Sequence, residues 1–312
     1  MNCFRASSTM ILMLLTLSSA HSATCPNRGA LSEEYCDSNY NLVADTPTDP
    51  DKLITPKTLI YSFTPFDGAG QVFSHFTKYL EQCLNTKTIF YPMQSNEAEI
   101  EAMHAHRLHL SGFSSGSTVT AVNKAGAIPF ATKGNEQGLV ASHMIFIVRT
   151  DSPYHAVEDL KGKRVAHTNP TSNSGHFAAL SIFPKMGITP GVDYTIIYSG
   201  QHGRSIRGVK SGDYDAAAVA EESLERMTLQ GEVKPHDFRI IYRSGAYPSV
   251  GFSYAHNLAP AFKAQLTHCF FEYRFPEPMQ AIFTGADRFV PINYQEHWQG
   301  VRELILHQKP SP

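Results

Sequence analysis

The chain has 312 residues, of which 42% are hydrophobic and 17% are charged, so it can bury one large core or two ordinary ones. This composition excludes disorder over the chain as a whole. Lysine and arginine number 26 against 28 acidic residues, and this balance argues against nucleic acid as a partner.

The first 22 residues have the pattern of a secretory signal peptide. One cation, Arg5, precedes the apolar run 10–17, and small residues follow it. The run is far shorter than the roughly 20 residues needed to cross a bilayer. Cleavage after Ala20 or Ser22 fits the pattern, and Ser22 is preferred. We therefore expect residues 1–22 to be removed and the mature chain to reside in the periplasm.

Export makes the cysteines of the mature chain candidates for disulfide bonds. Cys25, Cys36, Cys83 and Cys269 allow three pairings. One hypothesis joins Cys25 to Cys36 within a polar N-terminal extension, residues 23–54, and leaves Cys83 for Cys269. A lipid anchor on Cys25 is disfavoured because the residues before it lack the usual large apolar side chain. No CxxC motif with a second pair of ligands supports a zinc site.

From residue 55 onward, strand-like apolar runs alternate with helical patterns. The predicted strands are 59–63, 88–92, 108–113, 144–150, 164–167, 195–199, 216–219, 238–244 and 250–256. The predicted helices are 72–84, 97–107, 174–186, 203–211, 221–230, 258–272, 296–307 and one that starts near Ser117. This alternation predicts an α/β fold with mostly parallel sheets flanked by helices.

Two polar segments that carry proline and glycine, 149–163 and 243–251, predict crossings between two lobes. Lobe one would comprise residues 55–148 plus 252–312, and lobe two residues 149–251. In such folds, strand ends and helix starts face a cleft in which ligands bind.

The turn Asn169–His176 is the most informative segment. It lies between a predicted strand and a predicted helix, and Ser172, Asn173 and Ser174 are residues that favour a helix start. Gly175 allows close approach of a ligand to the backbone, and the first amides of a helix are free to bind an anion. The turn therefore predicts an oxyanion site, although one capped helix would account for part of it.

Two further strand ends carry candidate side chains. His202, in a glycine-bracketed turn, is a hydrogen-bond donor for an oxyanion. Glu221 and Glu222 follow the next apolar strand, where a carboxylate suits an anion site only if the ligand or the site carries a proton or an ammonium group. A stabilising interaction with the helix dipole is an equally good interpretation of Glu222.

The segment Gly112–Thr118 matches the pattern G-x-S-x-G of serine hydrolases, with Ser114 at its centre. No upstream oxyanion segment and no downstream Asp and His complete a triad, so a secreted hydrolase is a distant alternative. We prefer Ser114, Ser115 and Ser117 as hydroxyl and amide donors at a helix start.

Two other motifs give weaker evidence about function. The glycines of residues 66–73 lack the third glycine of a dinucleotide fingerprint. His104 and His106 point to different faces of the predicted helix, and no Cys or carboxylate completes a metal site with them. We expect no cofactor and no metal.

Residues 151–188 and 198–227 together resemble the phosphate/phosphite/phosphonate-binding periplasmic proteins of ABC importers. The family pattern has a DLKGK stretch, a D-P-x-S-T-S-G turn, an S-G-x-H turn and a G-x-x-D-A-A motif. Pro170, Ser172, Ser174, Gly175, His202 and Asp215 match this pattern. Asn169 replaces its Asp and Asn173 its Thr. The resemblance covers residues 55–305.

The resemblance implies the two-lobed type II fold, which closes on one small oxyanion and has no enzymatic activity. It implies a monomer that delivers phosphate, phosphite or a phosphonate to an ABC permease. Phe66, a candidate ligand residue, stands where many members have a Tyr after the proline of the first strand, and Glu221 is the candidate carboxylate for a ligand with an aminoalkyl group. A related branch binds arsenic oxyanions and reports to a membrane sensor histidine kinase; its pocket thiol has no counterpart in residues 112–120.

Overall fold

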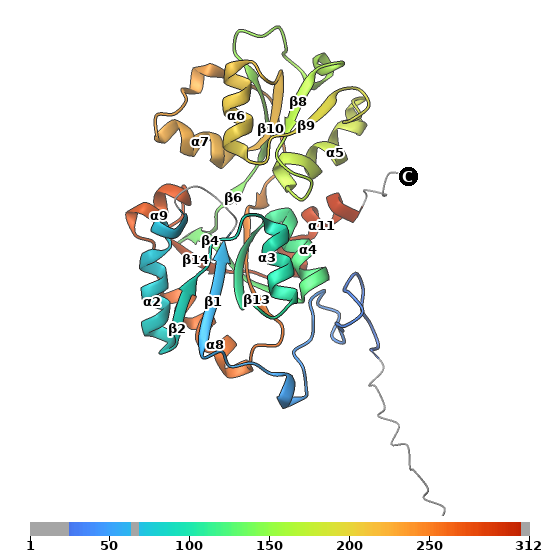
Figure 1. Ribbon diagram of the computed structural model, residues 1–312. Coiled ribbons are helices and arrows are strands. Elements are labelled where there is room, and N and C mark those ends of the chain that lie inside the picture. The colour runs from blue at the N-terminus through green and yellow to red at the C-terminus, as the bar shows by residue number, and fades with distance from the viewer. Residues whose placement is uncertain (1–24, 64–68, 307–312) are drawn as a thin grey trace, which may run out of the picture.

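The computed structural model describes residues 25–63 and 69–306. Two α/β lobes stand one above the other, and the chain crosses between them more than once (Figure 1). None of the helices in the described ranges is long and apolar enough to span a membrane.

Seven strands form the sheet of lobe one: β1 (Thr58–Phe63), β2 (Lys87–Phe90), β3 (Leu110–Ser114), β4 (Ala127–Asn135), β5 (Gly138–Leu139), β13 (Val250–Ala255) and β14 (Arg288–Pro291). Their order is β14-β4-β13-β3-β1-β2, and β5 pairs with β4. β1 runs parallel to β2 and β3, whereas β13 runs antiparallel to β3 and β4. The helices are α1 (Ala69–Val72), α2 (Ser74–Leu84), α3 (Asn96–His104), α4 (Ser115–Ala125), α8 (Pro260–Glu272), α9 (Glu277–Ile282), α10 (Tyr294–His297) and α11 (Gln299–Leu306).

The core of lobe one is rich in aromatic rings. In α2, Phe76, Leu80 and Leu84 repeat every four residues and are buried, as expected for the inner stripe of an amphipathic helix. The ring of Phe76 packs edge-on against Phe270 of α8 at 5.0 Å. A disulfide between Cys83 and Cys269 joins the same two helices, which confirms that part of the pairing hypothesis.

Five strands form the sheet of lobe two, in the order β11 (Phe238–Arg243), β7 (Met144–Arg149), β10 (Ala216–Ala220), β8 (Arg164–His167) and β9 (Thr195–Tyr198). β8 runs parallel to β9 and β10, and β7 runs antiparallel to β10 and β11. All five residues of β10 are buried, because apolar clusters pack on both faces of the sheet. The larger helices are α5 (Ala178–Ile182), α6 (His202–Ser211) and α7 (Glu221–Leu229), and the π-helix η3 spans Asn173–Phe177. Short 3₁₀ turns complete it: η2 (Val157–Leu160), η4 (Phe183–Met186) and η5 (Pro235–Asp237).

The chain crosses between the lobes a few residues away from the predicted positions. β6 (Ala141–Ser142) and β12 (Tyr247–Pro248) pair as a two-stranded ribbon between the lobes (Figure 1). Residues 144–148, expected in lobe one, hydrogen-bond within the sheet of lobe two, and residues 250–251 belong to lobe one. An apolar run identifies a buried strand but not the sheet that it joins, so the predicted boundary at 148 was wrong.

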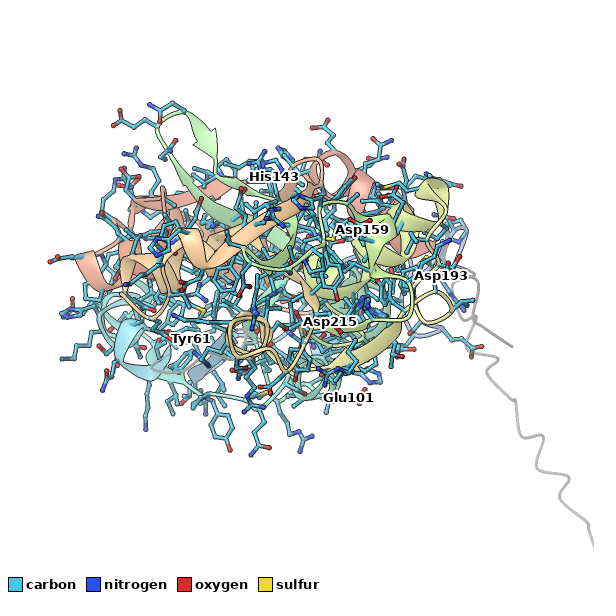
Figure 2. All side chains as sticks on the ribbon, turned by 90° about the horizontal axis from the view of Figure 1, so that it is seen from above. Tyr61, Glu101, His143, Asp159, Asp193 and Asp215 are labelled. Carbon is cyan, nitrogen blue, oxygen red and sulfur yellow. A yellow bond between two sulfur atoms is a disulfide. The ribbon has the colours of Figure 1, made fainter. Side chains whose placement is uncertain are left out.

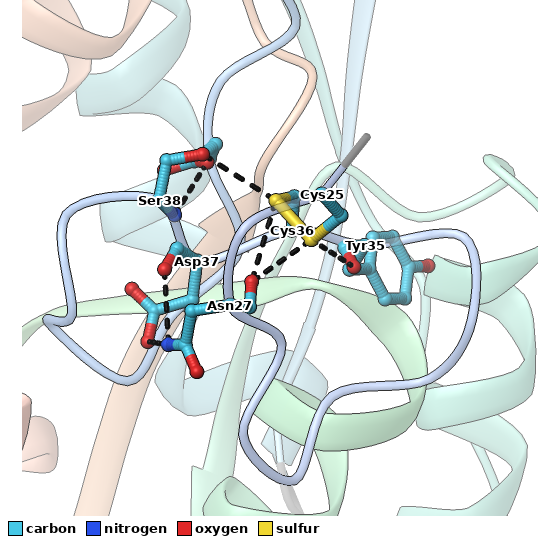
Figure 3. The surroundings of a disulfide bond; sticks show 7 residues. Cys25, Asn27, Tyr35, Cys36, Asp37 and Ser38 are labelled. Carbon is cyan, nitrogen blue, oxygen red and sulfur yellow. Dashed lines mark hydrogen bonds between the residues drawn. A yellow bond between two sulfur atoms is a disulfide. The ribbon is translucent and has the colours of Figure 1, made fainter. Parts of the chain in front are cut away.

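The N-terminal extension, described from residue 25 onward, packs on lobe one and contains the 3₁₀ turn η1 (Pro50–Lys52). Cys25 and Cys36 are joined by a disulfide, as hypothesised, and beside it Asn27 donates from its amide to the backbone and carboxylate of Asp37 (Figure 3). Tyr35 packs edge-on against the ring of His256 at 4.9 Å. The extension thus covers an apolar surface that includes residues of α4 and of the C-terminal helices.

Candidate functional site

A cleft of about 690 Å³ lies between the two lobes. Lobe two contributes the residues that follow β8, β9 and β10, so the carboxyl ends of three neighbouring parallel strands open into it. Lobe one contributes the junction of β3 with α4 and the residues that precede α3. Six of the predicted ligand residues line this cleft: Ser114, Ser115, Ser172, Asn173, Ser174 and His202.

The turn after β8 is held by its own hydrogen bonds. The Ser172 hydroxyl accepts from the backbone N–H of Gly175 at 2.9 Å and so caps the π-helix. A Cβ at position 175 would collide with the side chain of Thr168, so this close approach requires glycine. Asn173 is 2% exposed, and neither polar atom of its amide has a partner among the described residues. A buried amide without partners is costly, so it fits a ligand that both donates and accepts hydrogen bonds.

The junction of β3 and α4 faces this turn from lobe one. The Ser115 hydroxyl is buried and, within the described parts of the chain, also has no hydrogen-bond partner. Its backbone carbonyl accepts from the indole N–H of Trp298 at 3.0 Å, which fixes the start of the helix. Ser114 donates to the Ser117 hydroxyl at 3.0 Å, and Ser117 is fully buried beneath the cleft wall rather than in it. The backbone N–H of Ser115 donates to the carbonyl of Ser249 at 3.1 Å, so the Ser115 hydroxyl is the donor that this side offers to a ligand.

His202, at the start of α6, offers one defined donor. The backbone N–H of Ala220 donates to its Nδ1 at 3.2 Å, so the ring proton is assigned to Nε2. Burial, together with the charge of Arg226, lowers the pKa of His202 to about 4. The ring is therefore neutral at pH 7, and its Nε2 lies 3.5 Å from the Ser174 hydroxyl. An oxyanion beside Ser174 would be within reach of this donor.

The two lobes touch beside the cleft. The Thr171 hydroxyl in lobe two donates to the Glu97 carboxylate in lobe one at 2.9 Å. A Cβ on Gly116, in the first turn of α4, would collide with the backbone carbonyl of Thr171. Glycine at 116 therefore permits the lobes to approach closely, which also accounts for this glycine of the G-x-S-x-G pattern.

The sequence matches the family described as "ABC transporter, phosphonate, periplasmic substrate-binding protein" over residues 63–298, which is more than half of the chain. The chain belongs to this family of phosphonate-binding proteins. A curated relative, the phosphonates-binding periplasmic protein of Escherichia coli (strain K12), is 23% identical over 203 residues, which span 64% of this chain and 60% of that protein.

Solved structures of the family share the fold. PhnD1 from Prochlorococcus marinus (MIT 9301), in complex with methylphosphonate, matches with a TM-score of 0.70 and 17% identity over 80% of this chain and 97% of that one. A binding protein component of an ABC phosphonate transporter from Pseudomonas aeruginosa matches with a TM-score of 0.70 and 18% identity over 80% of this chain and 85% of that one. The chain thus has the predicted two-lobed type II periplasmic-binding-protein fold.

One of the predicted ligand residues, Glu221, does not line the cleft. Glu221 forms an ion pair with Arg243, with an oxygen of its carboxylate 2.8 Å from Nη2. Its neighbour Glu222 lines the cleft instead and pairs with Lys133 of β4. Both glutamates start α7, and a helix turns by about 100° per residue, so adjacent side chains face different directions. The sequence offered both glutamates and Glu221 was the predicted ligand residue, but it is Glu222 that lines the cleft.

Other cleft residues were missed by sequence reasoning. Arg226 follows Glu222 by four residues and therefore lies on the same face of α7, a spacing that could have identified it. Tyr247, in the ribbon between the lobes, also lines the cleft, and burial raises the pKa of its hydroxyl so that it stays protonated. No local signal distinguishes this tyrosine. The predicted ligand residue Phe66 lies outside the described residues.

Asp215, which matches the family pattern, forms hydrogen bonds within lobe two and does not line the cleft. It precedes β10 at the end opposite to the one that opens into the cleft, and its side chain is labelled in the view from above (Figure 2). Its carboxylate accepts from the backbone N–H of Arg164 at 2.9 Å. The hydroxyl of Tyr154 donates to the same carboxylate at 3.3 Å. This aspartate thus fastens the start of β8 to the start of β10.

The alternatives to a binding protein gain no support from the cleft. The Ser114 hydroxyl is bonded to another serine and not to an imidazole. His104 pairs with Glu34 of the extension at 2.9 Å. Across the described residues, no group of three His, Cys, Asp or Glu side chains is placed to hold a metal ion.

Proposed function

We propose that the mature protein is a periplasmic binding protein that captures a small phosphorus oxyanion, in the first place a phosphonate, for an ABC importer. The observation that carries the proposal is the set of unpaired buried groups in the cleft: the Asn173 amide from lobe two and the Ser115 hydroxyl from lobe one. Membership of the family and the methylphosphonate named for its Prochlorococcus relative support the same ligand class.

Binding is proposed to work by closure. Asn173, Ser174 and His202 approach the oxyanion from lobe two, while the Ser115 hydroxyl approaches from lobe one. Contacts from both lobes exist together only when the lobes are close, so the ligand shifts the population towards the closed form. The closed monomer would then dock on the permease, after removal of residues 1–22 during export.

An arsenic oxyanion with a sensor-kinase partner is the alternative ligand system. Capture of arsenite by a thiol has no candidate in the described residues, because all four cysteines there form disulfides. Arsenate resembles phosphate in shape and charge and is therefore kept in the ligand panel below.

A calorimetric and thermal-shift panel on residues 23–312 tests the proposal with methylphosphonate, phosphite, phosphate, arsenate and arsenite. We expect one-to-one binding of at least one phosphorus oxyanion without turnover, and a stabilisation of about 2.7 kcal/mol at 100 times the Kd. Ser174→Phe should abolish the response, whereas Ser211→Phe, at the far end of α6, should retain it. No response to any anion would contradict the proposed function.

A further inference from the structure

Two charged side chains form an ion pair between the lobes. Oxyanion binding alone does not explain why either of them is there. Lys133 lies on β4 of lobe one, and its ammonium is bonded to the carboxylate of Glu222 at the start of α7 in lobe two. The Lys133 side chain is 1% exposed, whereas that of Glu222 is 22% exposed and lines the cleft. The carboxylate therefore faces the ligand space, with the ammonium behind it.

This ion pair decides the charge of the cleft wall. Burial alone would raise the pKa of the Glu222 carboxyl, but the ammonium of Lys133 and the guanidinium of Arg226 hold that pKa below its ordinary value, so the group is ionised. An ionised carboxylate without a partner would repel an oxyanion and attract an ammonium group. Lys133 supplies that ammonium from the protein itself. His202 beside it is neutral, and Arg226 is a further cation that lines the cleft.

A ligand with its own ammonium group would meet a carboxylate whose charge Lys133 already compensates, and it would have to share that carboxylate with Lys133 or displace it. Within residues 25–63 and 69–306, Glu222 is the only hydrogen-bond partner of the Lys133 ammonium. Displacement would leave a fully buried cation unpaired, which is more unfavourable than never forming the pair. The Glu222 carboxylate therefore pairs more favourably with Lys133 than with the ammonium group of a ligand.

We propose that Lys133 is a specificity-determining residue that occupies Glu222 and makes the cleft select oxyanions without an amino group. This inference rests on the proposed function and deepens it by naming the ligand class. Lys133 acts through Glu222 and does not touch the ligand.

Titration calorimetry with methylphosphonate and 2-aminoethylphosphonate tests the proposal. The wild type should bind methylphosphonate at least about tenfold more tightly, a difference of about 1.4 kcal/mol. Lys133→Met keeps the length of the apolar stem and frees the carboxylate, so the ratio should shift by tenfold or more towards the amino compound. Adding Glu222→Gln to that variant should remove the gain. Lys210→Met, which removes a lysine paired with Asp237 elsewhere in lobe two, is the matched control and should leave the ratio unchanged.

The outcomes separate the two proposals. Equal affinity of the wild type for both ligands would overturn the role of Lys133, and so would an unchanged ratio in Lys133→Met. If Lys133→Met does not fold, the wild-type ratio still decides, because equal affinities there overturn the role of Lys133. Binding of neither ligand by the wild type would overturn the proposed function itself, and this inference with it.

Discussion

The two lobes bury different kinds of side chain. Lobe one is filled with aromatic rings, such as Phe270 and Phe289 at 4.6 Å, and is cross-linked by a disulfide. Lobe two has a central strand of alanines and valine, and next to it His167 and His176 are hydrogen-bonded to each other at 2.8 Å. We infer that lobe one mainly supplies stability, while lobe two supplies most of the polar groups that bind the ligand and respond to pH.

The largest expected effect is on lobe one. Replacing Cys83 and Cys269 by serine removes a link across 186 residues of sequence and should lower the free energy of unfolding by about 2–5 kcal/mol. Urea denaturation with the wild type as reference measures this loss. The Kd for methylphosphonate at a temperature where the variant is folded should change little. A large loss of affinity without a loss of stability would invert the proposed division between the lobes.

In lobe two, His202→Ala should weaken ligand binding. A hydrogen bond to a charged group contributes about 1.5–3 kcal/mol, so the Kd should rise roughly 10- to 100-fold in calorimetry. His202→Gln keeps an N–H donor and should lose less. Equal affinities of His202→Ala and the wild type would remove the imidazole from the site.

The buried histidines of lobe two should make stability depend on pH. Burial, with a smaller contribution from His176, lowers the pKa of His167 to about 3, below its value of about 6.5 in the unfolded chain. The unfolded state therefore binds more protons between these values, and stability present above pH 6.5 is lost as the pH falls. For one proton the slope is about 1.4 kcal/mol per pH unit.

Urea denaturation at pH 7 and pH 5 measures this slope. His167→Gln should flatten it relative to the wild type, and the exposed residue His236 provides a control in His236→Gln. A slope that is identical in His167→Gln and the wild type would show that this buried ring does not set the pH response of lobe two.

The smallest expected effect concerns the glutamate that faces away from the cleft. Glu221 is paired with Arg243 at the surface, and exposed pairs contribute little. Glu221→Gln should therefore change the Kd for methylphosphonate by less than about threefold, well below the effect of Lys133→Met on ligand preference. A larger loss of affinity would return Glu221 to the site.

Much of the fold could be predicted from the sequence, because local patterns determine it. Each predicted strand overlaps an observed one, and most of these strands are buried and carry continuous apolar runs. The predicted helix 174–186 is instead a π-helical turn, a short α-helix and a 3₁₀ turn that begins at Phe183, next to Pro184. Proline lacks the N–H that a continuous helix needs at that point.

The site could be predicted only in part. Ser172, Asn173 and Ser174 were found because strand-to-helix turns carry recognisable helix-start residues. Lys133 was not, because a lysine within a strand has no signal until the fold brings Glu222 to it from the other lobe. Such a pairing between the lobes depends on how the two lobes meet, which no local pattern encodes.

A crystal structure of the mature protein with methylphosphonate tests the central claim most directly. The account predicts phosphonate oxygens within about 3.2 Å of the Asn173 amide, the Ser115 hydroxyl and Nε2 of His202, with Lys133 still bonded to Glu222. A phosphonate bound elsewhere, or a cleft in which Asn173 and Ser115 remain without partners in the presence of bound ligand, would contradict it.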